Sequence, residues 1–253
     1  MVGAMYFLTM MQMLFNFLPT VVVFQGEKPI YVRERDSGMY DIWVYAATKH
    51  LAEMPIMLAV PLLLNSCIYF AIGFTNNIGQ WCQFYLILAM MVQAATGLGY
   101  CLSSIFNQET TAVACVPLFN IPLTLVAGYL INLKGIFQQT PQKYFAWLMY
   151  FSPLHYAFTG MMVAQFPVDG YPLTERVLEE YGFAGKSYWA CLAMLTLLSL
   201  GLRALVVVSL WLQDLTFSVG ASGDRRNQDF VPRSQERDVK ASGQGAFAGP
   251  NRT

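Results

Sequence analysis

This sequence carries few charged residues, and it lacks the motifs of several enzyme classes. Charged residues make up 12% of the chain and hydrophobic residues 56%, whereas soluble domains usually carry about a quarter charged residues. No GxxxxGK[ST], GxSxG or HExxH motif occurs, which excludes a phosphate-binding loop, a serine nucleophile and a zinc site of those types. We therefore predict that this chain contains no catalytic residue and binds no cofactor of its own.

The charges that are present balance, and the cysteines are dispersed. Lys and Arg total 15, as do Asp and Glu, so the chain has no excess of positive charge to attract nucleic acid. The five cysteines form no CxxC pair, and isolated cysteines in apolar runs are usually small buried hydrophobic side chains. These patterns predict neither a nucleic-acid partner nor a metal site.

Long hydrophobic stretches dominate the sequence instead. Between positions 54 and 133 the only charged residue is Glu109. At 1.5 Å per residue, a helix of about 20 apolar residues crosses a hydrocarbon core of about 30 Å. We predict an all-α integral membrane protein, a polytopic helical bundle of about five spans. The predicted spans are residues 2–24, 42–74, 81–106, 111–133 and 187–212.

Two further segments complete the predicted membrane domain, which covers residues 1–215. The apolar, aromatic stretch 137–166 is divided by Pro153, which indicates two short helices that enter the outer leaflet and return. Within the polar stretch that follows, residues 174–180 predict a short surface helix. Beyond position 215 the chain becomes rich in Gly, Ser and Arg, so residues 216–253 are predicted to be a disordered tail.

A dense charged segment, residues 26–40, separates the first two predicted spans. Because Lys and Arg near span ends favour the cytoplasmic side, this segment and the Arg-rich tail are predicted to be cytoplasmic, in the plasma membrane or an organelle membrane. Five spans then place Met1 on the outer side, although the N-terminal apolar run does not have the form of a signal peptide. We therefore expect the sequence to be the C-terminal part of a larger membrane protein.

Polar residues inside the predicted spans are candidate functional sites, because such residues are costly in lipid. Arg203 either extends its charge to the inner interface or pairs with a carboxylate on a neighbouring span. Asn120 and Thr124 lie one turn apart and form either interhelical hydrogen bonds or a substrate-facing wall. His155 is interpreted as a hydrogen-bonded or interfacial residue in preference to a ligand.

Several local sequences, taken in order, resemble a known family. They are GEKPIYVRERDSGMY at 26–40, KHLAEMP at 49–55, IYFAIGF at 68–74, AGYLINL at 127–133 and YFSPLHYAFTG at 150–160. Their order and spacing resemble the transmembrane domain of G-subfamily (White/PDR-type) ABC transporters, particularly the half-size White-like members. The resemblance covers about residues 1–215 and implies that the first span and the nucleotide-binding domain of that family are absent here.

The resemblance also implies roles for particular residues. Those of the charged segment would couple to a nucleotide-binding domain, those of the first and fourth spans would line a substrate cavity, and two more would plug it. The coupling residues would be Lys28, Arg33, Glu34 and Arg35. The cavity residues would be Met11, Leu14, Asn120 and Thr124, and the plug would be Tyr129 and Leu130.

An exporter half of this kind implies partners outside the chain. ATP and Mg²⁺ would bind a nucleotide-binding domain that is upstream or separate, and a second half-transporter would complete a homodimer or heterodimer in the lipid bilayer. The expected cargo is lipophilic or amphipathic: a lipid, sterol, pigment or terpenoid. Because the chain carries no ATP site, the alternative is a truncated, non-transporting membrane scaffold or pseudo-subunit.

Overall fold

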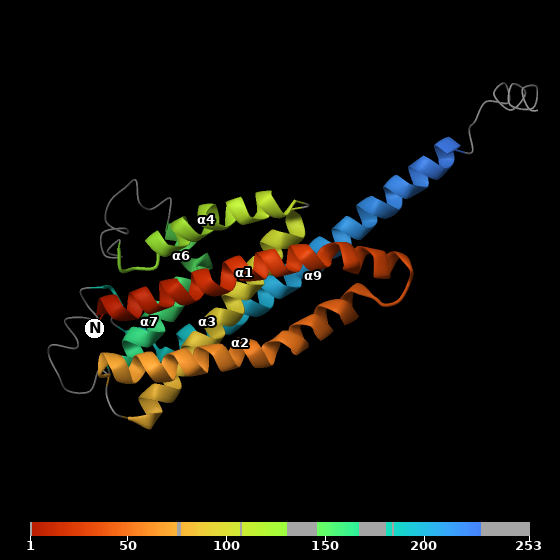
Figure 1. Cartoon of the computed structure of the whole chain (residues 1–253). Helices are drawn as coiled ribbons and strands as arrows, with labels where there is room; N and C mark the ends of the chain where they lie inside the picture. Colours follow the sequence, from red (N-terminus) through yellow and green to blue (C-terminus); the bar gives the residue numbers. More distant parts are fainter. Residues whose placement is uncertain are drawn as a thin grey trace, which may run out of the picture. The chain divides into compact units, whose positions relative to one another are not determined.

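The computed structural model describes residues 2–74, 77–106, 108–130, 146–166, 181–183 and 185–228. Within these ranges the chain is helical and contains no β-strand, which confirms the predicted all-α membrane fold. Figure 1 shows the helices in chain order. They are α1 (Val2–Asp36), α2 (Ile42–Ile72), α3 (Ile78–Ile105), α4 (Glu109–Leu125), α6 (Ala146–Phe151), α7 (Pro153–Gln165) and α9 (Tyr188–Gln228).

Four of the described helices are long and apolar enough to cross a membrane. They are α1, α2, α3 and the Tyr188–Gln213 part of α9. The remaining apolar helix, α4, has 17 residues, which corresponds to about 25 Å and falls short of a hydrocarbon core of about 30 Å. The predicted span 111–133 is therefore not one continuous helix. Pro122 removes a backbone donor near the helix end, and Gly128 then turns the chain with a φ of 107°.

Two helices continue beyond the ends that the sequence predicts. The helix α1 does not stop at position 24 but incorporates most of the charged segment. It ends in a Schellman motif, in which Gly38 has a φ of 74° and Met39 N–H donates to the Glu34 carbonyl at 3.3 Å. The helix α9 continues to Gln228 without an interrupting proline, against the predicted disorder of residues 216–228. Residues 229–253 lie outside the described part of the chain.

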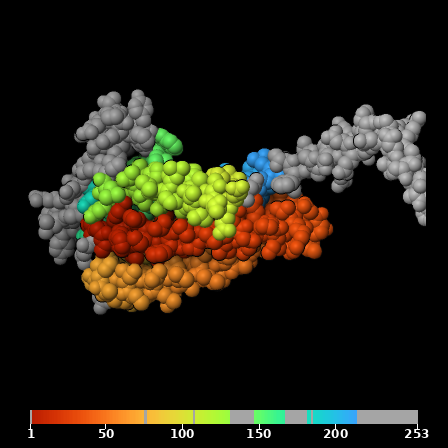
Figure 2. Space-filling view, turned by 45° about the horizontal axis from the view of Figure 1, so that its top comes forward, coloured from red at the N-terminus to blue at the C-terminus, as the bar shows by residue number. Residues whose placement is uncertain are grey.

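The helix α3 lies at the centre of residues 2–209. It packs against α1, α2, α4 and α7 and is the most buried of the four candidate spans. At Gly99, an added Cβ would stand 2.9 Å from the Thr20 side chain and 3.1 Å from the Phe17 carbonyl, so the α1 backbone approaches α3 closely. On the face shown in Figure 2, α1 lies between α2 and α4.

The short helices α6 and α7 meet at the proline that the sequence predicts as their boundary. Ser152 caps α7 by accepting a hydrogen bond from the His155 N–H at 3.4 Å, and Pro153 occupies the first turn. Almost every described residue of α7 is buried. The predicted helix at 174–180 lies outside the described residues.

Candidate functional site

At one end of the bundle, two residues of α1 satisfy the carboxyl end of α3. Lys28 donates from its ammonium group to the carbonyls of Ser104 at 2.9 Å and Phe106 at 3.0 Å. Gln25 donates to the Phe106 carbonyl at 2.8 Å and to another carbonyl of the same turn. The last carbonyls of a helix lack intrahelical donors and carry partial negative charge, so a cation is stabilising there. Lys28 is only 8% exposed, and the structure places it in this cap and not on an open docking surface.

A network of charged and polar side chains joins α1, α2 and α3 at the same end. Lys49 lies between two carboxylates: it forms an ion pair with Glu53 at 2.7 Å and another with Glu27 of α1. Glu53 in turn accepts a hydrogen bond from the Tyr100 hydroxyl of α3. Because Lys49 is nearly buried between its partners, this network fixes the three helices relative to one another.

The last turn of α1 joins the start of α2 through tyrosines. Glu34 accepts a hydrogen bond from the Tyr40 hydroxyl at 2.7 Å. The Tyr40 ring stacks on Tyr45, with 5.8 Å between ring centroids, and Tyr31 lies against Tyr45 at 4.3 Å. Partial burial and the Glu34 hydrogen bond raise the pKa of Tyr40 to about 12.

The four predicted coupling residues are thus placed differently from one another. Lys28 is buried in the α3 cap, whereas Arg33 is exposed and Glu34 and Arg35 are half-buried on the last turn of α1. Asp36, beside them, is also exposed. The surface open to a partner at this end is therefore the turn 33–36, at the tip of a helix.

The predicted cavity residues do not form one wall within the chain. Met11 lines an apolar groove of about 430 Å³ between α1 and α2, and Leu14 is half-buried. Asn120 and Thr124 are buried, and the Asn120 Oδ1 atom has no hydrogen-bond partner among the described residues. The Thr124 hydroxyl donates to the Ile121 carbonyl of its own helix at 2.7 Å.

At the opposite end of the bundle, side chains of α1 and of the α6–α7 region satisfy the carboxyl end of α4. The Tyr6 hydroxyl donates to the Thr124 carbonyl at 3.0 Å, and the Ser152 hydroxyl donates to the Leu123 carbonyl at 3.0 Å. The ring of His155, which is 1% exposed, lies 3.2 Å from the carbonyl of Ala127, in the turn that follows α4. A helix that ends at membrane depth needs such partners, because lipid supplies none.

An aromatic cluster forms around the predicted plug. Tyr129 stacks on Tyr6, with 4.7 Å between ring centroids, and on Tyr181 at 6.0 Å, while Phe158 packs edge-on against it at 6.0 Å. Leu130, the second predicted plug residue, is 57% exposed and lies outside this cluster. Of the two predicted plug residues, Tyr129 is therefore the one that packs into this cluster.

The sequence predicts that Arg203 either extends to the inner interface or pairs with a carboxylate, and its contacts match neither alternative in full. Its guanidinium donates to the side-chain carbonyl of Gln93, on α3, and lies 3.5 Å from the backbone carbonyl of the same residue. The partner is thus an amide on a neighbouring helix and not a carboxylate. An amide oxygen satisfies part of the guanidinium without a second buried charge.

Several residues of these contacts are absent from the sequence-based candidates. They are Tyr6, Gln25, Gln93 and Ser152. Their common signal is a hydrogen-bonding side chain near the end of an apolar run or within it. That signal indicates a polar contact, but it does not identify the partner. Among the described residues, no group of three His, Cys, Asp or Glu side chains could hold a metal ion.

Comparison with known proteins gives consistent matches. Residues 1–166 match the family model described as ABC-2 type transporter. The chain is 25% identical over 210 residues to the ABC transporter ATP-binding protein/permease wht-1 of Caenorhabditis elegans, covering 76% of this chain and 31% of the relative. It is 28% identical over 150 residues to Protein white of Drosophila melanogaster, covering 59% and 21%.

A third relative matches over most of this chain. ABC transporter G family member 47 of Oryza sativa subsp. japonica is 24% identical over 247 residues, covering 94% of this chain and 17% of the relative. The chain therefore spans less than a third of the length of each of these three relatives.

Proposed function

The chain belongs to the ABC-2 type transporter family of multi-pass membrane domains, and we propose that it is the membrane-embedded half of an ATP-driven exporter of lipophilic or amphipathic molecules. Candidate cargoes are lipids, sterols, pigments and terpenoids. ATP and Mg²⁺ are assigned to a nucleotide-binding domain, either upstream in the same polypeptide or separate. This chain's own contribution is to receive movement at the charged segment and to open the opposite end.

The continuity of α1 is the observation that supports this proposal most directly. The helix has 35 residues, which corresponds to about 50 Å. Its last turn carries the exposed Arg33, and its first turns carry Tyr6, which contacts Tyr129 and the carboxyl end of α4. A displacement of the charged tip would therefore be transmitted along one helix to the aromatic cluster.

Exposed apolar side chains supply the surface for a second protomer and for the cargo. On the face in Figure 2, α1 and α4 lie side by side, and both helices expose large hydrophobic residues. They are Phe7, Phe15, Leu18 and Val22 on α1, and Leu118, Phe119, Ile121 and Leu125 on α4. Two such faces, from a homodimer or heterodimer, would enclose an apolar route lined by these helices. In this arrangement Met11 and Leu14 would lie on the α1 wall, with Asn120 and Thr124 behind the α4 wall.

The experiment places this chain, with its nucleotide-binding domain, in proteoliposomes and measures ATP hydrolysis and ATP-dependent movement of a fluorescent phospholipid or sterol. The test variant is Arg33→Glu, because Arg33 is exposed and reversal of its charge perturbs a partner without disturbing the core. Reversal of one interfacial charge costs at least about 1.4 kcal/mol, a factor of about ten. We expect transport to fall by about that factor while ATP hydrolysis persists.

Thr48→Ala is the matched control, since Thr48 is exposed on the nearby first turns of α2 and hydrogen-bonds only to the carbonyls of Val44 and Tyr45. It should transport like the wild type. Equal transport in Arg33→Glu and the wild type would contradict the coupling role. ATP hydrolysis with no transport of any tested cargo by the wild type would favour the non-transporting scaffold.

A further inference from the structure

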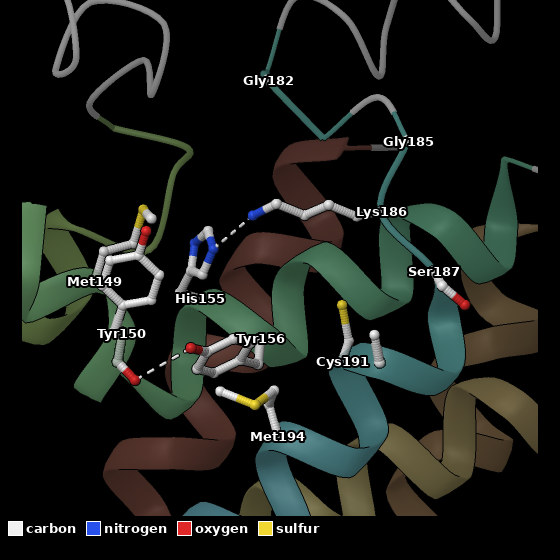
Figure 3. A pocket seen from close by; sticks show the side chains of 11 residues that line it. Met149, Tyr150, His155, Tyr156, Gly182, Gly185, Lys186, Ser187, Cys191 and Met194 are labelled. Carbon is white, nitrogen blue, oxygen red and sulfur yellow. Dashed lines mark hydrogen bonds between the residues drawn. The ribbon is translucent and has the colours of Figure 1, made fainter.

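A pocket of about 600 Å³ lies between α6, α7 and the start of α9, and none of its lining residues belongs to α1 or α4. Its volume falls within the range of about 300 to 1,000 Å³ that is typical of small-molecule sites. One side of α9 supplies Ala190 and Met194, and α6 supplies Met149. Figure 3 shows Met149 and Met194 together with the polar side chains of His155 and Lys186. The lining is thus largely apolar, with one charged group.

Among the described residues, the contacts of Lys186 include no anion. Its ammonium nitrogen lies 3.0 Å from the His155 Nε2 atom and 5.5 Å from the centre of the Phe183 ring. No carboxylate of the described residues lies within ion-pair distance of it. Burial lowers the pKa of Lys186, as expected for a cation that is partly removed from water without an anion.

Both ring nitrogens of His155 make hydrogen bonds, and one of these bonds holds Lys186 in place. An ammonium group only donates, so the Nε2 atom accepts from it, and the Nδ1–H donates to the Ala127 carbonyl at 3.2 Å. Burial and the neighbouring Lys186 charge lower the pKa of His155 to about 4, so the imidazole is neutral at pH 7. Figure 3 shows the Lys186 side chain extended toward this ring, and both residues line the pocket.

We propose that this pocket binds a single-chain amphiphile with one anionic head group, such as a fatty acid. Lys186 contacts the head group, and Met149, Ala190 and Met194 contact the hydrocarbon chain. The amino end of α9, which begins at Tyr188, adds a favourable field for an anion beside Lys186. The site does not rest on the proposed export function, because binding here requires neither ATP nor a second protomer.

The test is equilibrium binding of radiolabelled oleate to the purified chain in detergent, compared with radiolabelled oleyl alcohol, which has the same chain and no charge. A hydrogen-bonded ion contact at a half-buried site is worth a factor of about ten or more. We expect the wild type to prefer oleate by about that factor. Lys186→Met should abolish the preference, and Lys186→Arg, which keeps the charge, should retain most of it.

A second variant tests the chain-binding part of the pocket. Ala190 is exposed on α9 and lines the pocket, so Ala190→Trp fills the space without altering the core. Binding of both probes should fall by about tenfold or more. The proposal is overturned if Lys186→Met keeps the preference for oleate or if Ala190→Trp binds both probes normally. It is also overturned if acetate competes as well as oleate, which would indicate a plain anion site.

Discussion

The two ends of α1 are held by different kinds of contact. Near its carboxyl end, charged and amide side chains make directional bonds: Lys28 and Gln25 cap α3, and Glu27 pairs with Lys49. Near its amino end, Tyr6 is packed among aromatic rings, with a single hydrogen bond to the α4 backbone. The carboxyl end of α1 is held by directional hydrogen bonds and an ion pair, and the amino end is held mainly by stacking of aromatic rings.

This difference suits the proposed role of α1, in which the helix receives movement at one end and changes its neighbours at the other. Hydrogen bonds weaken steeply when donor and acceptor are misaligned, so we expect the charged end to move as one piece with α2 and α3. Offset-stacked rings tolerate sliding, and each pair contributes about 0.5 to 1.5 kcal/mol beyond its buried area. The aromatic end can therefore rearrange at a lower cost than the charged end.

The largest expected effect comes from crowding the close contact between α3 and the middle of α1 at Gly99. The new side chain in Gly99→Val would meet Thr20 and the Phe17 carbonyl of α1, and overpacking of this kind costs about 1 to 3 kcal/mol. We expect a clear fall in the temperature at which half of the detergent-solubilised protein loses its monodisperse elution peak.

Two other glycines serve as controls for that crowding. Gly201→Val adds a side chain in open space, so it should be nearly neutral. Gly3→Val meets chiefly the movable hydroxyl end of Tyr129 at the aromatic end, so it should fall between the other two. Equal losses at Gly3 and Gly99 would contradict the view that the aromatic end adapts more readily than the middle of α1.

The second prediction separates two roles within the charged segment. Lys28→Met removes a buried cation and leaves the Ser104 carbonyl without that donor, a loss of about 1 to 3 kcal/mol. Arg33→Gln removes an exposed charge and should change stability by less than about 0.5 kcal/mol. Thermal unfolding of the two purified variants makes the comparison. Equal stability would mean that Lys28 does not hold the end of α3.

The sequence predicts the helical fold and the family because both depend on features spread over many residues. Apolar runs and the order of local motifs persist whatever the individual contacts are. It does not predict that α1 incorporates the charged segment, because a run of charges indicates water on composition alone. The cap on α3 that makes the extension stable joins residues 76 to 81 positions apart in the chain.

The candidate site shows the same limit more strongly. Asn120 and Thr124 are recognisable as polar residues in an apolar run, but which way they face depends on how α4 packs against α1. Arg203 is recognisable as a costly charge, whereas its amide partner Gln93 lies 110 positions away. Single positions indicate that a contact is required, and only the packing of the helices identifies the contact.

The third prediction addresses the aromatic end. Tyr129→Leu removes stacking on Tyr6 and Tyr181, a loss of about 1 to 3 kcal/mol for the two pairs. It should raise ATP-independent leakage of fluorescent cargo from proteoliposomes. Tyr129→Phe keeps the ring and should leak like the wild type. If the Leu variant seals as well as the Phe variant, stacking does not close this end.

The smallest expected effect concerns the hydrogen bond from Tyr40 to Glu34, which joins the tip of α1 to α2. Because this contact is only partly buried, Tyr40→Phe should cost less than about 1 kcal/mol at pH 7. The contact also has a pH signature. The hydroxyl titrates near 10 in the unfolded chain, and its folded pKa is about 12.

The protonated Tyr40 is thus favoured by folding, so its contribution is complete below pH 10 and is lost as the pH rises from 10 toward 12. Wild type and Tyr40→Phe should converge in unfolding temperature across that interval. Ser37→Ala, which removes a neighbouring hydroxyl that donates to the Glu34 backbone, provides a control and should keep a constant offset. A constant offset for Tyr40→Phe as well would show that the Glu34 contact does not anchor the tip. The rigidity of the charged end would then depend on the Lys28 cap and the Lys49 network alone.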